Sequence, residues 1–297
     1  MAILKEIVRL QLGERSKKMK KKIIIAALLC TTLLVSIFAF AGCREREFVG
    51  FDIELSKLVA EELGLTVEFQ KIQWETKEIE LQGKNIDLIW NGFTINDDRR
   101  AQMEISTPYM YNKQVAVIRK ADKSKYTSLE TIRNAKFVCE AGSTGQLAAE
   151  LNNFANVVKV DDGGQITAMT EVKSGNSDIA LVDSVLANYF CQEGTSYSNL
   201  MIIPNLILVE EQYGIAARKG DKGTIDKINV ALAKLQENGQ LKQLADKYKL
   251  GSELCDLSYE SKWDSLTNEE KEGWNYIQQK GKFIVGYTEY APIAYWD

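Results

Sequence analysis

Residues 51–72 read FDIELSKLVAEELGLTVEFQKI, and this stretch sets a pattern that the rest of the chain repeats. In its first thirteen residues the apolar side chains recur at helical spacing: Phe51, Leu55, Leu58, Val59 and Leu63. Gly64 ends that helix, and residues 65–72 then alternate apolar and polar side chains, as a strand does. A helix followed directly by a strand is the repeating unit of an α/β protein.

The same alternation continues toward the C-terminus. Strands are expected at 86–92, 113–120, 136–142, 156–160, 177–183, 201–204 and 207–219. Helices are expected from Asp97, at 128–135, from Ser143, and at 163–174, 184–191, 222–239 and 240–248. Strands that alternate with helices predict parallel-rich sheets flanked by helices, which is an α/β fold.

The N-terminus has the pattern of an export signal. Residues 1–22 carry eight basic and two acidic side chains, and an uncharged, largely apolar run follows to Gly42. This order predicts a signal peptide over 1–42. Cys43 follows the small residues Ala41 and Gly42, which resembles a lipobox and predicts lipidation of Cys43. An uncleaved membrane-spanning helix is the alternative, since the run is just long enough to cross a bilayer.

Charge restricts the partners of the mature chain. The whole chain has 37 basic and 41 acidic residues, so removal of the basic N-terminus leaves residues 43–297 with a net charge of about −10. An acidic chain is unsuited to nucleic acid, which is bound through basic patches. Its 255 residues predict two modest domains.

The chain contains no histidine and five cysteines. The absence of histidine excludes histidine-dependent catalytic triads and most zinc sites, and no cofactor is expected. Cys139, Cys191 and Cys255 remain in the mature chain. They form either one disulfide and a free thiol, or three buried small apolar residues.

Several segments together resemble a known family. In order along the chain they are FVGFDIELSKLVAEELG (48–64), GKNIDLIWNGFTINDDRR (83–100), STPYMYNKQVAVIRK (106–120) and SDIALVDSVLANYF (177–190). They resemble the type II periplasmic binding proteins for polar amino acids, the extracellular solute-binding proteins of family 3. The resemblance implies two α/β lobes joined by two crossover strands. Lobe 1 is expected at 43–110, 205–250 and 283–297, lobe 2 at 111–204, and a linker with a helix at 251–282.

The resemblance also implies a clamp for the carboxylate of a free amino acid. The run Gly92-Phe93-Thr94-Ile95-Asn96-Asp97-Asp98-Arg99 matches the family's ligand motif. In that motif Arg99 binds the carboxylate, while Thr94 and Gly92 also contact the ligand. The planar guanidinium suits this role because it donates two parallel hydrogen bonds. The alternative interpretation is that Arg99 only forms ion pairs with nearby carboxylates at the solvent-exposed start of a helix.

Two further polar residues match the family's ligand positions. Thr144 follows a strand and begins a helix, where backbone N–H groups favour an anion. Asp183 ends an apolar strand and matches the family's ammonium-binding aspartate. For Thr144 the alternative is helix capping by Ser143 or Thr144, and both roles can hold together, with Ser143 as the cap and Thr144 on the ligand. For Asp183 the alternative is capping of the helix that begins at Ser184.

Trp74 and Tyr290 match aromatic positions that the family places beside the ligand side chain. Both are equally consistent with core packing. Glu289, next to Tyr290, is a candidate partner for a basic ligand side chain. Which amino acid binds stays open among cystine, glutamine, arginine, lysine and histidine.

The order of the segments departs from the family. The piece that matches the family's first strand, GKFIVGYTEYAPIAYWD, stands at the C-terminus, at 281–297. A circular permutation accounts for this order, and so does a cut through a tandem array. The strand either completes the sheet of its own chain or pairs with another chain.

The resemblance implies a non-enzymatic, lipid-anchored protein on the extracytoplasmic face of the cell membrane. Its partners would be a free polar or basic amino acid, or cystine, and the permease of an ABC importer. The alternatives are a non-binding fragment of a tandem binding protein and a dehydratase-like enzyme on the same fold. The enzyme would require a general acid or base at the substrate, and no pair of such residues stands out.

Overall fold

The computed structural model describes residues 46–297. Its main sheet has nine strands, eight of them in the order β2-β10-β3-β9-β5-β8-β6-β7. The ninth strand, β4, pairs with β9. The strands of this sheet, with a separate small pair β1 and β11, are β1 (Phe48–Val49), β2 (Thr66–Lys71), β3 (Leu88–Thr94), β4 (Met103–Ile105), β5 (Met110–Arg119), β6 (Phe137–Glu140), β7 (Val157–Val160), β8 (Ile179–Asp183), β9 (Leu200–Arg218), β10 (Lys282–Tyr287) and β11 (Tyr295–Trp296).

The helices confirm the predicted alternation. They are α2 (Phe51–Glu62), α3 (Lys77–Gln82), α4 (Asp97–Gln102), α5 (Leu129–Ile132), α6 (Thr144–Leu151), α7 (Gly164–Ser174), α8 (Ser184–Phe190), α9 (Lys222–Glu237), α10 (Gln240–Lys247) and α11 (Asn268–Lys280), with short 3-10 turns η1 (Trp74–Thr76), η2 (Lys120–Asp122), η3 (Gly251–Glu253) and η4 (Trp263–Ser265). The apolar stripe that predicted α2 is its buried face, where Phe51, Leu55 and Val59 are fully buried. Burial of each such side chain stabilises the fold by about 1.5–3 kcal/mol.

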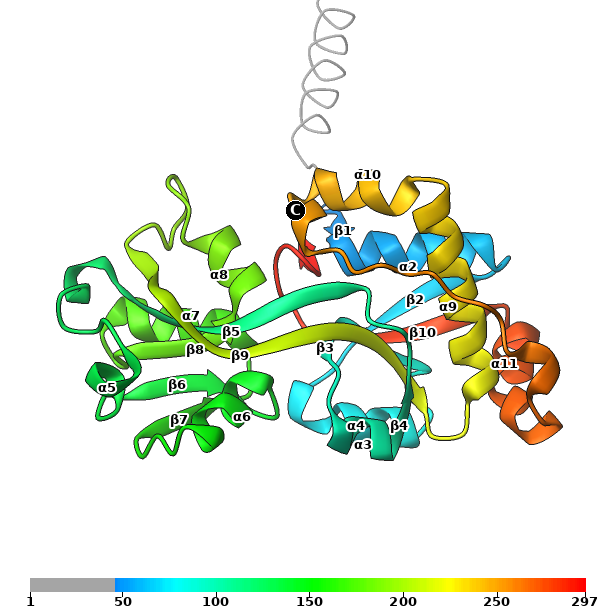
Figure 1. Cartoon of the computed structure of the whole chain (residues 1–297), viewed down its shortest axis with the longest axis horizontal. Helices are drawn as coiled ribbons and strands as arrows, with labels where there is room; N and C mark the ends of the chain where they lie inside the picture. Colours follow the sequence, from blue (N-terminus) through cyan, green and yellow to red (C-terminus); the bar gives the residue numbers. More distant parts are fainter. Residues whose placement is uncertain (1–45) are drawn as a thin grey trace, which may run out of the picture. The chain divides into compact units, whose positions relative to one another are not determined.

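Two long antiparallel strands, β5 and β9, connect the two halves of residues 48–297 (Figure 1). In one half β10 pairs in parallel with β2 and β3, and α2, α9, α10 and α11 pack there. In the other half β6 pairs in parallel with β7 and β8, and α6, α7 and α8 pack against these strands. This arrangement is the two-lobe fold of periplasmic binding proteins.

Strand β9 differs from the prediction of two separate strands at 201–204 and 207–219. It runs without interruption from Leu200 to Arg218. The register against β5 shifts so that Val115 lies opposite Ile207 while Val117 lies opposite Ile202. This bulge accommodates Pro204, which has no N–H to donate to the ladder.

Strand β10, in the C-terminal segment, pairs within its own chain and not with another chain. It inserts between β2 and β3 of its own chain, in parallel with both, and Phe283 and Val285 are buried there. The helix before it, α11, begins with a capping box in which Thr267 and Glu270 exchange hydrogen bonds with each other's backbone. The C-terminal residues therefore form part of the interior of the sheet.

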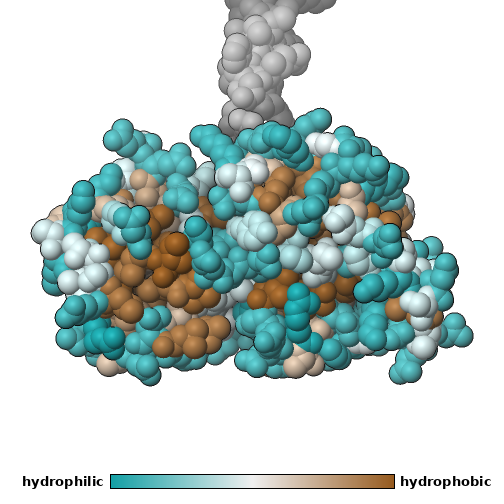
Figure 2. All heavy atoms as spheres, in the orientation of Figure 1, coloured by the Kyte–Doolittle hydropathy of each residue, from teal (hydrophilic) through white to brown (hydrophobic). Residues whose placement is uncertain are grey.

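The surface is polar over most of the face in Figure 2, with hydrophobic residues gathered over β5 and β9. Among residues 46–297, no helix has the length and hydropathy needed to span a bilayer. The predicted signal peptide and Cys43 lie outside the described residues. In the described part of the chain the three cysteines Cys139, Cys191 and Cys255 are unpaired, and burial raises the pKa of each thiol to about 11.

Candidate functional site

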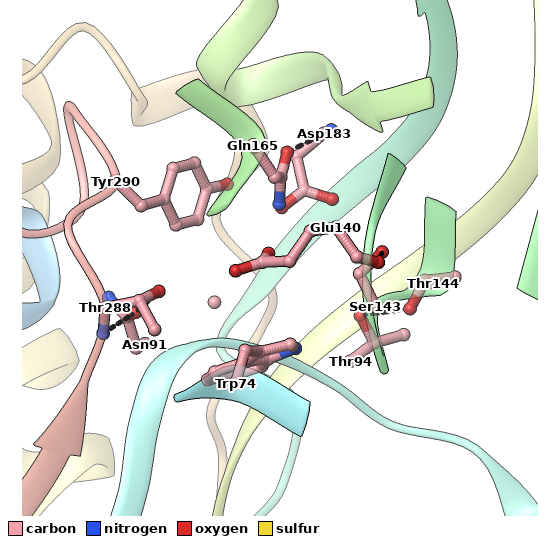
Figure 3. Close-up of a pocket in the computed structure, with 11 residues that line it drawn as sticks. Trp74, Asn91, Thr94, Glu140, Ser143, Thr144, Gln165, Asp183, Thr288 and Tyr290 are labelled. Atoms are coloured by element: carbon pink, nitrogen blue, oxygen red, sulfur yellow. Dashed lines mark hydrogen bonds between the residues drawn. The ribbon is translucent and has the colours of Figure 1, made fainter. Parts of the chain in front are cut away.

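A polar pocket lies where the ends of β3, β6 and β8 meet the C-terminal loop that follows β10 (Figure 3). Its walls are Trp74, Asn91, Gly92, Thr94, Glu140, Ser143, Thr144, Gln165, Asp183, Thr288 and Tyr290. Six of the seven residues that the sequence singled out for the ligand are in this set, and the seventh, Arg99, contacts it from outside.

Gly92 lets the β3 backbone approach the aromatic wall. Its φ is +59°, and a Cβ at this position would lie 2.7 Å from a ring carbon of Tyr290. The Gly92 N–H donates to the Asp52 carboxylate at 2.8 Å, and the Tyr109 hydroxyl donates to the same carboxylate at 2.8 Å. Burial raises the pKa of Asp52 to about 7 despite these two bonds. Asp52 therefore positions the β3 segment that lines the pocket.

Thr94 and Thr144 are neighbours in the pocket wall (Figure 3), although fifty residues separate them in the sequence. The Thr144 hydroxyl donates to Thr94 Oγ1 at 2.9 Å, and the Thr94 hydroxyl donates to the Glu211 carboxylate at 2.9 Å. Burial, reinforced by the charge of Asp183, raises the pKa of Glu211 to about 7. This chain of bonds connects β3 and β9 with the start of α6.

Ser143, rather than Thr144, is the N-cap of α6. Its Oγ accepts a hydrogen bond from the Gln146 N–H at 3.2 Å. The first helical position is left to Thr144, whose buried side chain lines the pocket.

Asp183 lies at the C-terminal end of β8, as predicted, and it is buried. Its side chain does not cap α8. It accepts instead from the Gln165 amide at 2.7 Å and from the Gln114 amide, while Gln165 Oε1 accepts from the Asp183 N–H at 2.8 Å. Two amide donors thus hold a carboxylate at the pocket wall, and Figure 3 shows Gln165 beside Asp183.

Arg99 is half-buried beside the pocket, and its side chain forms no ion pair among the described residues. Its guanidinium donates to the Thr94 carbonyl at 2.7 Å and to the Gly142 carbonyl at 3.3 Å, and it lies 4.6 Å from the centre of the Phe93 ring. Burial lowers the pKa of Arg99. The surface pairing considered as its alternative role is therefore not formed.

Trp74 forms the wall opposite Tyr290, and its ring packs edge-on against Phe93. Beside it, the buried ammonium of Lys77 donates to the Trp74 carbonyl at 3.0 Å and to the Gly142 carbonyl at 3.2 Å. Burial, followed by the charge of Arg99, lowers the pKa of Lys77 to about 8. Sequence reasoning missed Lys77, because nothing in the local pattern marks a lysine for burial.

The C-terminal loop supplies Thr288 and Tyr290. The Tyr290 and Tyr213 hydroxyls are hydrogen-bonded at 2.7 Å, and Asn91 Oδ1 accepts from the Thr288 N–H at 2.8 Å. Glu289, which the sequence offered as a partner for a basic ligand, does not line this pocket and pairs with Lys71 at 2.8 Å.

Glu140 and Gln165 are wall residues that the sequence analysis missed. Glu140 ends β6, which neighbours β8, so its carboxylate stands beside that of Asp183. The rule that ligands bind at the C-terminal ends of parallel strands would have found it. Burial, followed by the charge of Asp183, raises the pKa of Glu140 to about 8.

Sequence comparison gives curated relatives of similar length. The probable histidine-binding protein of Neisseria gonorrhoeae is 29% identical over 204 residues, which are 67% of this chain and 74% of that protein. The ABC transporter glutamine-binding protein of Bacillus subtilis is 26% identical over 80% of this chain and 88% of its own length.

Solved structures give the same picture. A mutant of ArgBP from T. maritima has a TM-score of 0.63 at 30% identity, over 68% of this chain and 85% of that one. An ABC uptake transporter substrate-binding protein of Streptococcus pneumoniae with bound histidine has a TM-score of 0.62 at 31% identity, over 71% and 85%.

Residues 38–251 match the family described as bacterial extracellular solute-binding proteins, family 3. The match covers well over half of the chain and ends before α11 and β10. This chain belongs to the bacterial extracellular solute-binding proteins of family 3.

Proposed function

We propose that this protein binds a free amino acid in the pocket between β3, β6, β8 and the C-terminal loop, and delivers it to an ABC importer. The observation that carries the proposal is the convergence of Thr94, Thr144, Asp183 and Tyr290 on one buried pocket from distant parts of the chain. The relatives named for histidine, glutamine and arginine binding support it.

Each role follows from the chemistry of a zwitterion. The Asp183 carboxylate binds the ligand ammonium, because its two amide donors hold it in a fixed orientation. Arg99 and Thr144 bind the ligand carboxylate, and Arg99 exchanges its bond to the Gly142 carbonyl for this anion. Thr94 and Gly92 contact the ligand from β3, and Trp74 and Tyr290 enclose its side chain.

The same proposal places the protein on the extracytoplasmic face of the membrane, anchored through a lipid on Cys43. It also treats β10 as the family's first strand in a changed chain order. Support for this interpretation comes from its central position in the sheet and from its place outside the matched residues 38–251.

Thermal unfolding of the full chain, purified in mild detergent, against the twenty amino acids and cystine tests the proposal. A ligand that binds only the folded state stabilises it by about 2.7 kcal/mol at a hundred times its Kd. We expect a rise in Tm with one ligand or a small group, and loss of this rise in Asp183→Asn. A folded protein whose Tm is unchanged by every ligand would overturn the proposal.

A further inference from the structure

We propose that Glu140 makes the pocket selective for an amino acid with a cationic side chain. The inference rests on the proposed function and names the class of its ligand. The cation would be a guanidinium or an ammonium at the far end of the ligand, and Glu140 would be its partner.

The Glu140 side chain is buried, with 4% of its surface exposed, and its carboxylate extends into the middle of the pocket between Trp74 and Tyr290 (Figure 3). Its Oε1 has no hydrogen-bond partner among the described residues. A buried carboxylate oxygen without a partner is costly to the folded protein, and a cationic ligand would supply that partner.

Asp183 cannot replace Glu140 in this role. Its two carboxylate oxygens already accept from the Gln114 and Gln165 amides, and the proposed function assigns its charge to the ligand ammonium. Glu140 is therefore a second, separate carboxyl group on the same wall.

A wider acidic groove shares Thr288 with the pocket. Its charged walls are four carboxylates and one lysine: Glu80, Asp161, Asp162, Glu289 and Lys71. Gly164, also in the groove wall, lies so close to Glu140 that an added Cβ would be 2.5 Å from Oε1. The Glu140 carboxylate thus stands where a long ligand side chain would pass from the pocket toward this acidic groove.

A comparison of arginine with citrulline isolates the effect of side-chain charge on affinity, because the two ligands have nearly the same shape and the citrulline side chain is neutral. Titration calorimetry on the full chain in detergent should give arginine an affinity at least about tenfold higher than citrulline, as expected for a charge-assisted hydrogen bond. In Glu140→Gln this ratio should fall to about one, chiefly through loss of arginine affinity. Glu193→Gln removes an exposed carboxylate that lines neither cavity, and it should keep the wild-type ratio.

Equal affinities in the wild type, or a ratio that survives in Glu140→Gln, would overturn the inference and leave the proposed function standing. Binding of a neutral amino acid without binding of arginine would also overturn the inference and leave the proposed function standing. Binding of no amino acid at all would overturn both. The wild-type ratio needs no variant, so it decides the inference even if Glu140→Gln does not fold.

Discussion

The Thr144 hydroxyl donates a hydrogen bond to the Thr94 hydroxyl at 2.9 Å, and this bond joins the end of β3 to the start of α6 in the pocket wall. The Thr94 hydroxyl in turn donates a hydrogen bond to the buried Glu211 carboxylate. The two threonines are thus structural as well as candidate ligand residues. Removal of the central hydroxyl leaves a donor and an acceptor unpaired in the interior.

Thr94→Val should lower the free energy of unfolding by about 1–3 kcal/mol, because Thr144 loses its acceptor and Glu211 loses a donor. Urea unfolding followed by circular dichroism measures this change. Thr66→Val, on an exposed position of β2, controls for the exchange of hydroxyl for methyl and should change stability by about 0.5 kcal/mol or less. Equal midpoints for the two variants would contradict the structural role of Thr94.

Gly92→Ala should destabilise the protein more than Gly64→Ala does. Both glycines have a positive φ, so both alanines carry the backbone strain of about 1–3 kcal/mol. Only at position 92 does the new Cβ also meet an aromatic ring, that of Tyr290, whereas position 64 has nothing within 4 Å. Thermal unfolding of both variants isolates the contact with the ring, and equal losses of Tm would show that the ring moves away freely.

Arg99→Lys should weaken amino-acid binding, and Arg99→Ala should weaken it further. Lysine keeps the positive charge but cannot donate two parallel hydrogen bonds to a carboxylate. We expect a loss of about 1–3 kcal/mol of binding free energy in Arg99→Lys, measured by titration calorimetry. Equal affinity of the wild type and Arg99→Lys would show that a positive charge is sufficient to bind the ligand carboxylate and that the planar guanidinium is not required.

The pH dependence of stability should change in Glu140→Gln. The pKa of Glu140 is about 8 in the folded protein against an ordinary value of 4.5. Between these values the unfolded chain has released the proton that the folded protein still holds. The contribution of Glu140 to the free energy of unfolding is therefore complete below pH 4.5 and is lost progressively up to about pH 8.

Without ligand, Glu140→Gln should accordingly gain stability relative to the wild type as the pH rises from 5 to 8, since glutamine does not ionise. Urea unfolding of both proteins at several pH values in this range measures the gain. Asp52 and Glu211, whose pKa values are raised to about 7, are present in both proteins, so their contribution largely cancels. A constant difference across the range would contradict the raised pKa of Glu140.

Most of the fold was predictable because its patterns are local. The apolar stripe of α2, the stop at Gly64 and the alternation of β2 are each contained within a few residues. The prediction of two strands around Pro204 was wrong for the same reason. Proline breaks a local pattern, whereas the bulge that accommodates it in β9 depends on the partner strand β5.

In the site, too, the residues in local motifs were predictable, and those whose role depends on tertiary packing were not. Thr94, Thr144 and Asp183 were predictable from turns and strand ends that resemble a family. Glu140 was missed although it ends β6, where the strand-end rule applies. Lys77 was not predictable, because a lysine at a helix start is an ordinary surface residue in most contexts. Only packing against Asp183, Arg99 and Gly142 makes Glu140 and Lys77 buried groups with shifted pKa values.

The sequence by itself determined the α/β class, the family, and most of the residues that share the pocket, because periodicity, turn residues and motifs are properties of short segments. The tertiary structure alone decided that β10 lies in the middle of the sheet, that Thr144 meets Thr94, and that Glu140 faces the pocket with an unpaired oxygen. These are relationships between residues far apart in the chain, and burial and hydrogen-bond partners exist only once the strands and helices have packed together.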